Sequence, residues 1–340
     1  MSTSPPSIVV GLNAVIIALT DGQPRVLTVS LPEDMPIEGG TRAGGGKGQR
    51  LLEALPTGPL DPEGDRTLEL ALRRWVCAYA GFELGYVEQL YTFGDRDRDP
   101  RELGGGPRVV SAAYLALVRE SEPADGLGAR WRSVYRFLPW EDWRGGRPQV
   151  IDEHIAQALT RWIEAGRDPE DRHLRRVRAG VSFGLEDSPW DGERVLDRYE
   201  LLFELGLVAE SIRDRESLKA GSANPEIHRG LGLEMAFDHR RILATALGRI
   251  RAKIRYRPVV FELMPSTFTL LQLQQAVEAL AGVGLHKQNF RRLVEQGGLV
   301  EGTGRQEHLT GGRPAELFRF RREVLLERPA PGVGLPGAHH

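Results

Sequence analysis

The chain has 340 residues, of which 41% are hydrophobic and 27% are charged. These proportions exclude a disordered chain, and the length is enough for two or three globular domains. Gly (40) and Pro (22) exceed their average use, which favours long loops. The single cysteine, Cys77, excludes an internal disulfide framework and a Cys-rich zinc site.

The apolar stretches of the chain are too short for a membrane protein. The longest, Ile8–Leu19, has about 12 residues and includes Asn13, whereas a membrane helix needs about 20. No basic residue precedes Arg25, so we expect no secretory signal. We therefore expect a cytoplasmic protein without membrane contact.

The net charge of −2 conceals two parts of opposite sign. Residues 239–328 carry 16 Lys and Arg against 8 Asp and Glu, while the rest carries 29 against 39. A basic carboxyl-terminal domain on an acidic body is typical of nucleic-acid-binding proteins. A merely solvated basic surface is the alternative.

The first 120 residues alternate β-type and helical patterns. Two β-branched runs, Ile8–Leu19 and Arg25–Ser30, flank a Thr-Asp-Gly-Gln-Pro turn and predict a hairpin. Apolar residues at helical spacing predict a helix from Leu68, capped by Thr67 and ending before Gly81. Two further strands are expected over Tyr86–Phe93 and Val109–Val118.

A Gly-rich segment lies between Leu31 and Gln49. A phosphate-binding loop of the pattern Gly-x4-Gly-Lys-Ser/Thr would need Gly at position 41 and Ser or Thr at position 48. Thr41 and Gly48 stand there instead. The segment therefore predicts a flexible loop and argues against a nucleoside triphosphatase.

The middle of the chain, from about Ser121 to Phe237, is less periodic. Amphipathic patterns predict helices over Ile151–Ala165 and Arg194–Ser211, with loops over Gly166–Asp171 and Arg215–Gly230. Five of the six tryptophans fall in this section, which indicates packed structure.

The carboxyl-terminal part has the order helix, helix, turn, helix and two strands. A basic helix from Asp238 ends before Pro258, and Thr269 with Gln272 forms a capping box for the next. A third helix follows from about His286 to Gln296. Strands over Leu299–Glu301 and Glu316–Phe320 complete the order of a winged helix-turn-helix.

The third helix separates an apolar face from a polar one. Phe290, Leu293 and Val294 are expected in the core. The other side carries groups suited to base edges and phosphates, namely Lys287, Gln288, Asn289, Arg291 and Arg292. Arg313 at the wing tip is placed to reach a minor groove, and phosphate contacts are expected from Arg251, Lys253 and Arg255. A winged helix used for protein contacts alone is one alternative. Another is that Arg291 and Arg292 only solvate the helix or pair with Glu295.

The segment Gly58–Phe82, GPLDPEGDRTLELALRRWVCAYAGF, resembles a Nudix box, the loop-helix-loop that binds metal ions over a pyrophosphate. Aligned on Gly81-Phe82, it has Arg74 at the box arginine but Ala78 and Tyr79 where the paired metal-binding glutamates belong. Because Mg²⁺ needs hard oxygen ligands at these positions, we expect no catalytic residues and no bound metal.

A Nudix-like domain followed by a winged helix resembles the NrtR family, the Nudix-related transcriptional regulators of NAD metabolism. Several segments resemble its NadQ-type branch, namely IRYRPVVFELMP (254–265), FTLLQLQ (268–274), LHKQNFRRLV (285–294), GRPAELFRF (312–320), YVEQLYTFGD (86–95) and FLPWEDWR (137–144). The resemblance implies a homodimeric repressor of NAD biosynthesis or salvage genes that binds double-stranded operator DNA. It also implies a nucleotide effector such as ADP-ribose, NAD or ATP, with no further cofactor.

We therefore expect an α+β protein with a Nudix-like α/β/α sandwich (residues 1–165), a helical middle section (166–236) and a winged helix-turn-helix (237–330). Ligand contacts are expected at Gly58, Arg74 and Tyr91. Two alternatives remain open. One is an active Nudix hydrolase of nucleoside diphosphate derivatives with an appended DNA-binding domain, and the other is a protein-interaction adaptor.

Overall fold

The computed structural model describes residues 8–32, 51–81, 83–96, 98–99, 102, 106–123, 128–218, 230–307 and 314–333. The Gly-rich segment expected to form a flexible loop falls mainly in 33–50, outside these ranges, and so does Arg313. Within the described residues, no helix is both long enough and apolar enough to cross a membrane.

A seven-stranded mixed sheet forms the amino-terminal part, in the order β3-β2-β1-β6-β5, with β4 paired to β1 and β7 to β2. Strands β1 and β6 are parallel, and the other pairs are antiparallel. The strands are β1 (Ile8–Thr20), β2 (Gln23–Pro32), β3 (Leu51–Ala54), β4 (Thr57–Pro59), β5 (Tyr86–Phe93), β6 (Arg108–Leu117) and β7 (Arg130–Ser133). The predicted hairpin is confirmed, and its turn residues Asp21 and Gly22 both have positive φ.

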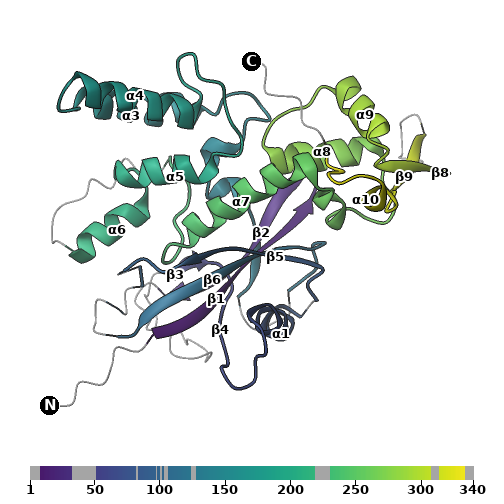
Figure 1. Ribbon diagram of the computed structural model, residues 1–340, viewed down its shortest axis with the longest axis horizontal. Helices are drawn as coiled ribbons and strands as arrows, with labels where there is room; N and C mark the ends of the chain where they lie inside the picture. The colour runs from purple at the N-terminus through teal and green to yellow at the C-terminus, as the bar shows by residue number, and fades with distance from the viewer. Residues whose placement is uncertain are drawn as a thin grey trace.

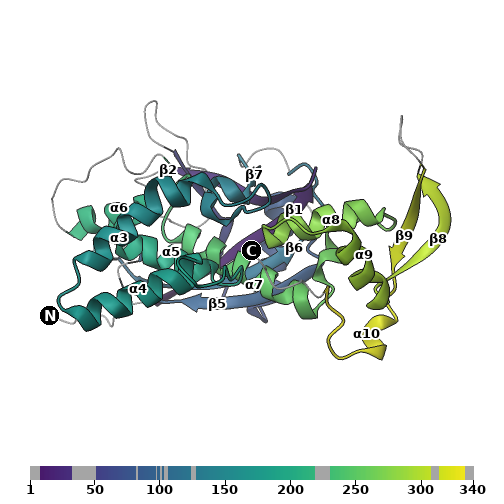
Figure 2. The same cartoon turned by 90° about the horizontal axis from the view of Figure 1, so that it is seen from above.

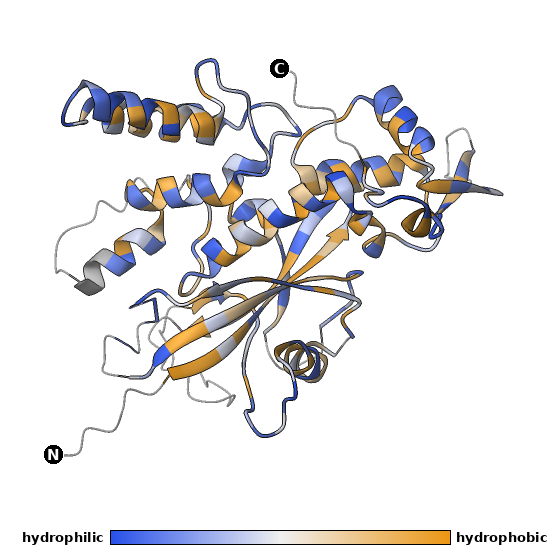
Figure 3. Ribbon diagram, viewed as in Figure 1, coloured by the Kyte–Doolittle hydropathy of each residue, from blue (hydrophilic) through white to orange (hydrophobic). Residues whose placement is uncertain are grey.

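Helices cover both faces of this sheet, because successive residues of a strand point to opposite sides. Leu12, Ala14 and Ile16 of β1 pack with helix α1 (Leu68–Ala80) on one face. Val15 and Ile17 join a larger core with α7 (His239–Tyr256) on the other. Figure 1 shows α1 on one side of the sheet and α7 with α8 on the opposite side. Strands β1 and β6 are consequently hydrophobic over most of their length, as Figure 3 shows.

Helix α1 begins and ends where the sequence predicts. The Thr67 hydroxyl accepts a hydrogen bond from the backbone N–H of Leu70 at 3.2 Å. The helix stops at Gly81, whose φ of 77° lies in the left-handed region.

The middle section is more helical than its sequence indicates. The first predicted helix is confirmed as a π-helical turn, η3 (Ile151–Ile155), that continues into α3 (Ala156–Glu164). The expected loop over Gly166–Asp171 is wrong at its end, because α4 (Pro169–Phe183) already starts there, capped by Asp168. The helix expected over 194–211 is two helices, α5 (Val195–Glu204) and α6 (Ala209–Leu218), separated by Gly206 with a φ of 74°.

The carboxyl-terminal elements follow the predicted order. They are α7, the 3-10 turn η4 (Val259–Glu262), α8 (Leu270–Ala281), α9 (Lys287–Gln296), β8 (Val300–Glu307), β9 (Ala315–Phe320) and α10 (Val324–Glu327). Figure 2 shows the β8–β9 wing and the α3–α4 pair at opposite ends of the molecule. The domain limits at 165 and 236 stay a prediction. Helix α7 lies after the second of these limits and packs against α5, β1 and β5, which lie before it.

Candidate nucleic-acid interface

Helix α8, which leads into α9, has a defined beginning and a defined end. Thr269 Oγ1 accepts from the backbone N–H of Gln272 at 3.2 Å, and the Gln272 side chain accepts from the Thr269 N–H at 2.7 Å, so the predicted capping box is confirmed. The helix ends at Gly282, with a φ of 74°. A Cβ atom there would collide with the Arg251 side chain and the Glu141 carbonyl, so only glycine fits.

Helix α9 has an apolar face toward the core and an exposed polar face, as its periodicity predicts. Phe290 is 2% exposed and Val294 is fully buried, while Leu293 is half-buried. All five residues predicted to read DNA are exposed, namely Lys287, Gln288, Asn289, Arg291 and Arg292. Figure 3 shows hydrophilic residues predominating along this helix.

The polar side chains of this face have no partners in the part of the chain that the structure describes. Among the described residues, no side-chain hydrogen bond or ion pair engages any of the five, and Arg291 and Arg292 form no ion pair with Glu295. Many other arginines are paired, for example Arg249 with Glu88 at 2.9 Å. The α9 face thus presents uncompensated positive charge and amide groups, which suits a DNA major groove.

The wing adds a cation that sequence reasoning did not single out. Arg305 on β8 is exposed, and its guanidinium has no partner among the described residues. It follows Gly304, whose φ of 69° lies at an irregularity in the β8–β9 pairing. The available signal was an arginine directly after a glycine, with no other charged residue between Glu301 and Glu307. Arg319, also exposed, is held by Glu301 at 2.6 Å.

The basic residues of α7 do not form the phosphate-binding row expected from sequence. Arg251 is 2% exposed and ion-paired to Glu141, so the expected phosphate contact is wrong. Lys253 is largely buried and donates to the Tyr86 hydroxyl at 2.7 Å and to Glu88. Burial would lower the pKa of Lys253, but these partners raise it above its ordinary value. Only Arg255 remains exposed, although it pairs with Glu193 at 2.8 Å.

The winged helix is joined to the sheet through the last turn of α8. Carbonyl groups at a helix end have no partner within the helix and need one elsewhere. Those of Ala279, Leu280 and Gly282 accept from the Tyr135 hydroxyl (2.6 Å), Arg251 Nε (3.2 Å) and the Trp143 N–H (2.7 Å). Because these donors come from the sheet domain and α7, α9 has a fixed position relative to the sheet.

The three expected ligand residues do not lie together. Gly58 on β4 is buried, and a Cβ atom there would lie 2.7 Å from the Trp75 ring, so Gly58 is a packing residue and its expected ligand contact is wrong. Tyr91 on β5 pairs in register with Ala113, whose side chain lies on the α7 face of the sheet. Arg74 is on α1, across the sheet, so Tyr91 and Arg74 cannot share one site.

Arg74 itself is exposed and held in a two-point ion pair. Its Nε and Nη2 donate to the two carboxylate oxygens of Asp65 at 2.9 and 2.8 Å. These hydrogen bonds keep the pKa of Asp65 below its usual value. The pair links α1 to the loop that precedes it.

The comparisons with known proteins agree with this architecture. Residues 260–320 match the family of NrtR DNA-binding winged helix domains. A stretch of 94 residues is 42% identical to the ADPR responsive transcriptional repressor NtrR of Acinetobacter baylyi. That stretch covers 28% of this chain and only 37% of the Acinetobacter protein.

The complete fold is also similar to solved structures. NrtR of Shewanella oneidensis, complexed with a 27mer DNA, superimposes with a TM-score of 0.52 and 21% identity, covering 93% of this chain and 94% of that chain. The same protein without DNA gives the same TM-score and identity and covers 95% of its chain. Residues 260–320 are therefore similar to NrtR DNA-binding winged helix domains, within a chain that has the α+β fold seen in the Shewanella NrtR.

Proposed function

We propose that this protein is a transcriptional repressor of NAD biosynthesis or salvage genes that releases or binds its operator in response to ADP-ribose. The observation that carries the proposal is the cationic and amide face of α9, whose side chains have no partner among the described residues. This face lies in a segment that matches the NrtR DNA-binding winged helix family. The Acinetobacter relative is described as ADPR responsive, which supports ADP-ribose over NAD or ATP as the effector.

The DNA contacts follow from which side chains are exposed. Gln288, Asn289, Arg291 and Arg292 would enter the major groove, with Lys287 on the flank. Arg305 would reach the adjacent groove from the wing. We expect the same of Arg313 from its place in the sequence. Arg255 is the one member of the α7 set exposed enough to contact a phosphate.

The sheet domain would bind its nucleotide without cleaving it. Helix α1 carries a single acidic residue, Glu69, which forms an ion pair with Arg73 at 2.9 Å. Ala78 is exposed where a Nudix hydrolase would present a metal-binding glutamate. Within the described ranges, no group of three or more His, Cys, Asp or Glu residues is arranged to hold a metal ion. Arg74 is our candidate for the effector's phosphates, because its guanidinium is exposed.

DNA selection from a random library tests the regulatory function. The protein should enrich a palindromic sequence, and gel-shift affinity for it should change on adding ADP-ribose. A hydrolase would instead convert ADP-ribose in the presence of Mg²⁺ at about 1 per second or faster. Failure to enrich any sequence, or turnover at such a rate, would overturn the proposal.

A further inference from the structure

Leu285, in the connection between α8 and α9, is held by two side chains of α8. Its backbone N–H donates to Glu278 Oε1 at 2.8 Å, and its carbonyl accepts from Gln274 Nε2 at 2.9 Å. Gln274 also donates to Glu278 Oε1 at 2.9 Å, across one turn of the helix. Gln274 is 8% exposed and Glu278 is half-buried, so these bonds lie in a partly dehydrated environment that strengthens them.

The start of α9 depends on these contacts with α8. Among the described residues, the side chain of the N-cap residue, His286, forms no capping hydrogen bond. The residue before an N-cap often fixes the angle at which the chain enters a helix. Leu285 is that residue, and its side chain packs against the core that contains Phe290 of α9. The direction of α9 is therefore set where Gln274 and Glu278 hold Leu285.

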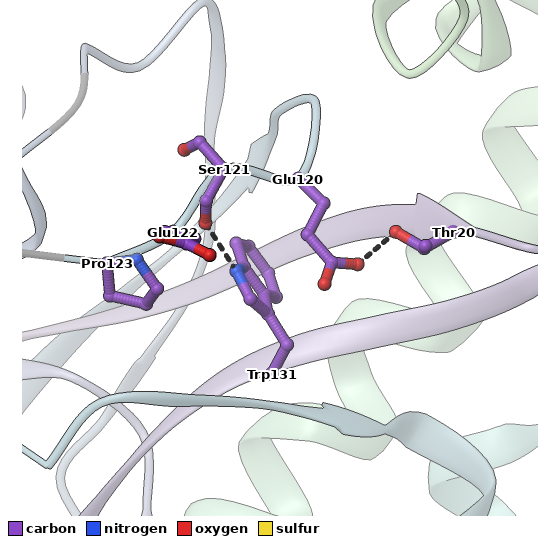
Figure 4. A pocket seen from close by; sticks show the side chains of 6 residues that line it. All are labelled: Thr20, Glu120, Ser121, Glu122, Pro123 and Trp131. Atoms are coloured by element: carbon purple, nitrogen blue, oxygen red, sulfur yellow. Dashed lines mark hydrogen bonds between the residues drawn. The ribbon is translucent and has the colours of Figure 1, made fainter.

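Helix α8 rests in turn on the β1–β2 turn of the sheet. Strand β2 packs against α8, and the Gly22 carbonyl of the turn accepts from Arg144 Nη1 at 2.7 Å. Figure 4 shows the end of β1 just before the turn, where the Thr20 hydroxyl donates to Glu120. Arg25 of β2 lies 3.6 Å from the same carboxylate. Because Glu120 joins both strands of the hairpin, α8 has a firm support, and the Leu285 contacts extend it to α9.

We infer that Glu278 is a positioning residue for operator reading, which sets the direction of α9 through the Leu285 backbone. The inference rests on the proposed DNA-binding function. The Glu278 carboxylate already accepts from two donors and would be repelled by phosphates, so it acts through the protein rather than as a DNA contact. Base edges are read by hydrogen bonds of narrow geometry, whereas phosphate contacts carry no sequence information. A shifted α9 should therefore lose sequence preference before it loses DNA binding.

Three variants of the full chain separate positioning from charge. Glu278→Ala removes the acceptor and should lower the operator-to-scrambled affinity ratio by roughly 10-fold or more. Glu278→Gln keeps an acceptor oxygen for the Leu285 N–H but removes the charge, so it should retain the ratio. Gln274→Met has a similar volume but no donor, and should lower the ratio as Glu278→Ala does. Gel-shift titrations with the selected palindrome and its scrambled form measure each ratio.

Hydrogen exchange provides a measurement that needs no DNA. In the peptide covering residues 282–287, exchange should be faster in Glu278→Ala and unchanged in Glu278→Gln, because only the first loses the Leu285 bond. Glu262→Ala, at an exposed acidic position of the same domain, is the control and should keep both the exchange rate and the affinity ratio.

The competing roles of Glu278 give different results. If only its charge matters, both Glu278 variants bind all DNA more tightly, since each removes a repulsive carboxylate. If it serves folding alone, Glu278→Ala weakens operator and scrambled DNA equally. Either result, or an unchanged ratio in Glu278→Ala, overturns the inference and leaves the proposed function standing. An original chain that prefers no sequence would instead refute the proposed function, and the inference with it.

Discussion

Arg251 of α7 and Glu141 of the 3-10 turn η2 (Pro139–Glu141) form a buried ion pair, with Arg251 Nη1 2.5 Å from Glu141 Oε2. Arg198 of α5 donates to both oxygens of the same carboxylate, at 2.6 and 2.8 Å. Burial by itself would raise the pKa of Glu141, but the two guanidinium groups hold it below its usual value. One carboxylate thus joins the sheet domain, the middle helices and the long helix that leads into the winged helix.

Glu141→Gln should destabilise the protein by about 3–5 kcal/mol, because it leaves two buried guanidinium groups without a counter-charge. Denaturant unfolding measures this change. Glu153→Gln, at an exposed position, is the control and should stay within about 0.5 kcal/mol of the original chain. If Glu141→Gln unfolds at the same denaturant concentration as the original chain, Glu141 does not form buried ion pairs with Arg198 and Arg251.

Asn289→Ala or Arg292→Ala should weaken operator binding by about 1–3 kcal/mol per half-site, because each would lose hydrogen bonds to a base edge. Each should also relax sequence preference at one operator position. Gel-shift titrations with operator and scrambled DNA, at several salt concentrations, separate this from a phosphate contact, which lowers all affinities alike. Arg161→Ala, exposed on α3, is the control. If both α9 variants keep the operator-to-scrambled ratio, α9 is not the reading element.

Light scattering at micromolar concentration should give about twice the chain mass of 37.8 kDa. A single winged helix has one short recognition helix, so high operator affinity requires two half-sites and a two-fold dimer. A species that remains monomeric while protecting a palindrome would refute this expectation.

Folding stability should fall between about pH 6 and pH 3, in part because of His239. Its ring is buried, and its Nδ1 accepts from the Leu55 N–H at 3.0 Å. Burial, with Arg98 nearby, lowers the pKa of His239 from 6.5 to about 3. In this range the unfolded chain binds a proton that the native chain does not, so the free energy of unfolding decreases as pH falls.

Between about pH 6 and pH 3, His239→Gln should reduce the slope of the free energy of unfolding against pH by up to about 1.4 kcal/mol per pH unit, which corresponds to one proton. This expectation does not depend on how the substitution changes stability at neutral pH. Denaturant unfolding as a function of pH measures the slope. His173→Gln, at an exposed position, should leave the slope as it is. A His239→Gln slope equal to that of the original chain would show that another group is responsible.

Gly58→Ala should destabilise the protein by about 1–3 kcal/mol, because its Cβ would lie 2.7 Å from the Trp75 ring. Thermal unfolding measures the effect, and Gly145→Ala, where a Cβ would have no atom within 4 Å, is the matched control. Equal melting temperatures for the two variants would mean that the ring moves aside freely.

The sequence by itself determined those elements whose signals come from residues close together in the chain. The hairpin at Asp21-Gly22, the caps of α1 and α8, and the apolar face of α9 depend on residues a few positions apart, which any reading of periodicity and turn chemistry can use. The order of the winged helix and the exposed polar face of α9 followed from the same signals, whereas the resemblance to the NrtR family came from whole segments of matching sequence.

Only the tertiary structure decided which charged residues are available for binding. Arg251 and Arg255 lie on the same helix with the same chemistry, yet one is buried against Glu141, 110 residues away, and the other is exposed. Gly58 and Tyr91 were likewise assigned by their motifs to one site, but Gly58 packs under Trp75 and Tyr91 faces the other side of the sheet. The local sequence pattern does not predict such partners, because burial and pairing of a charge depend on residues that are distant in the chain.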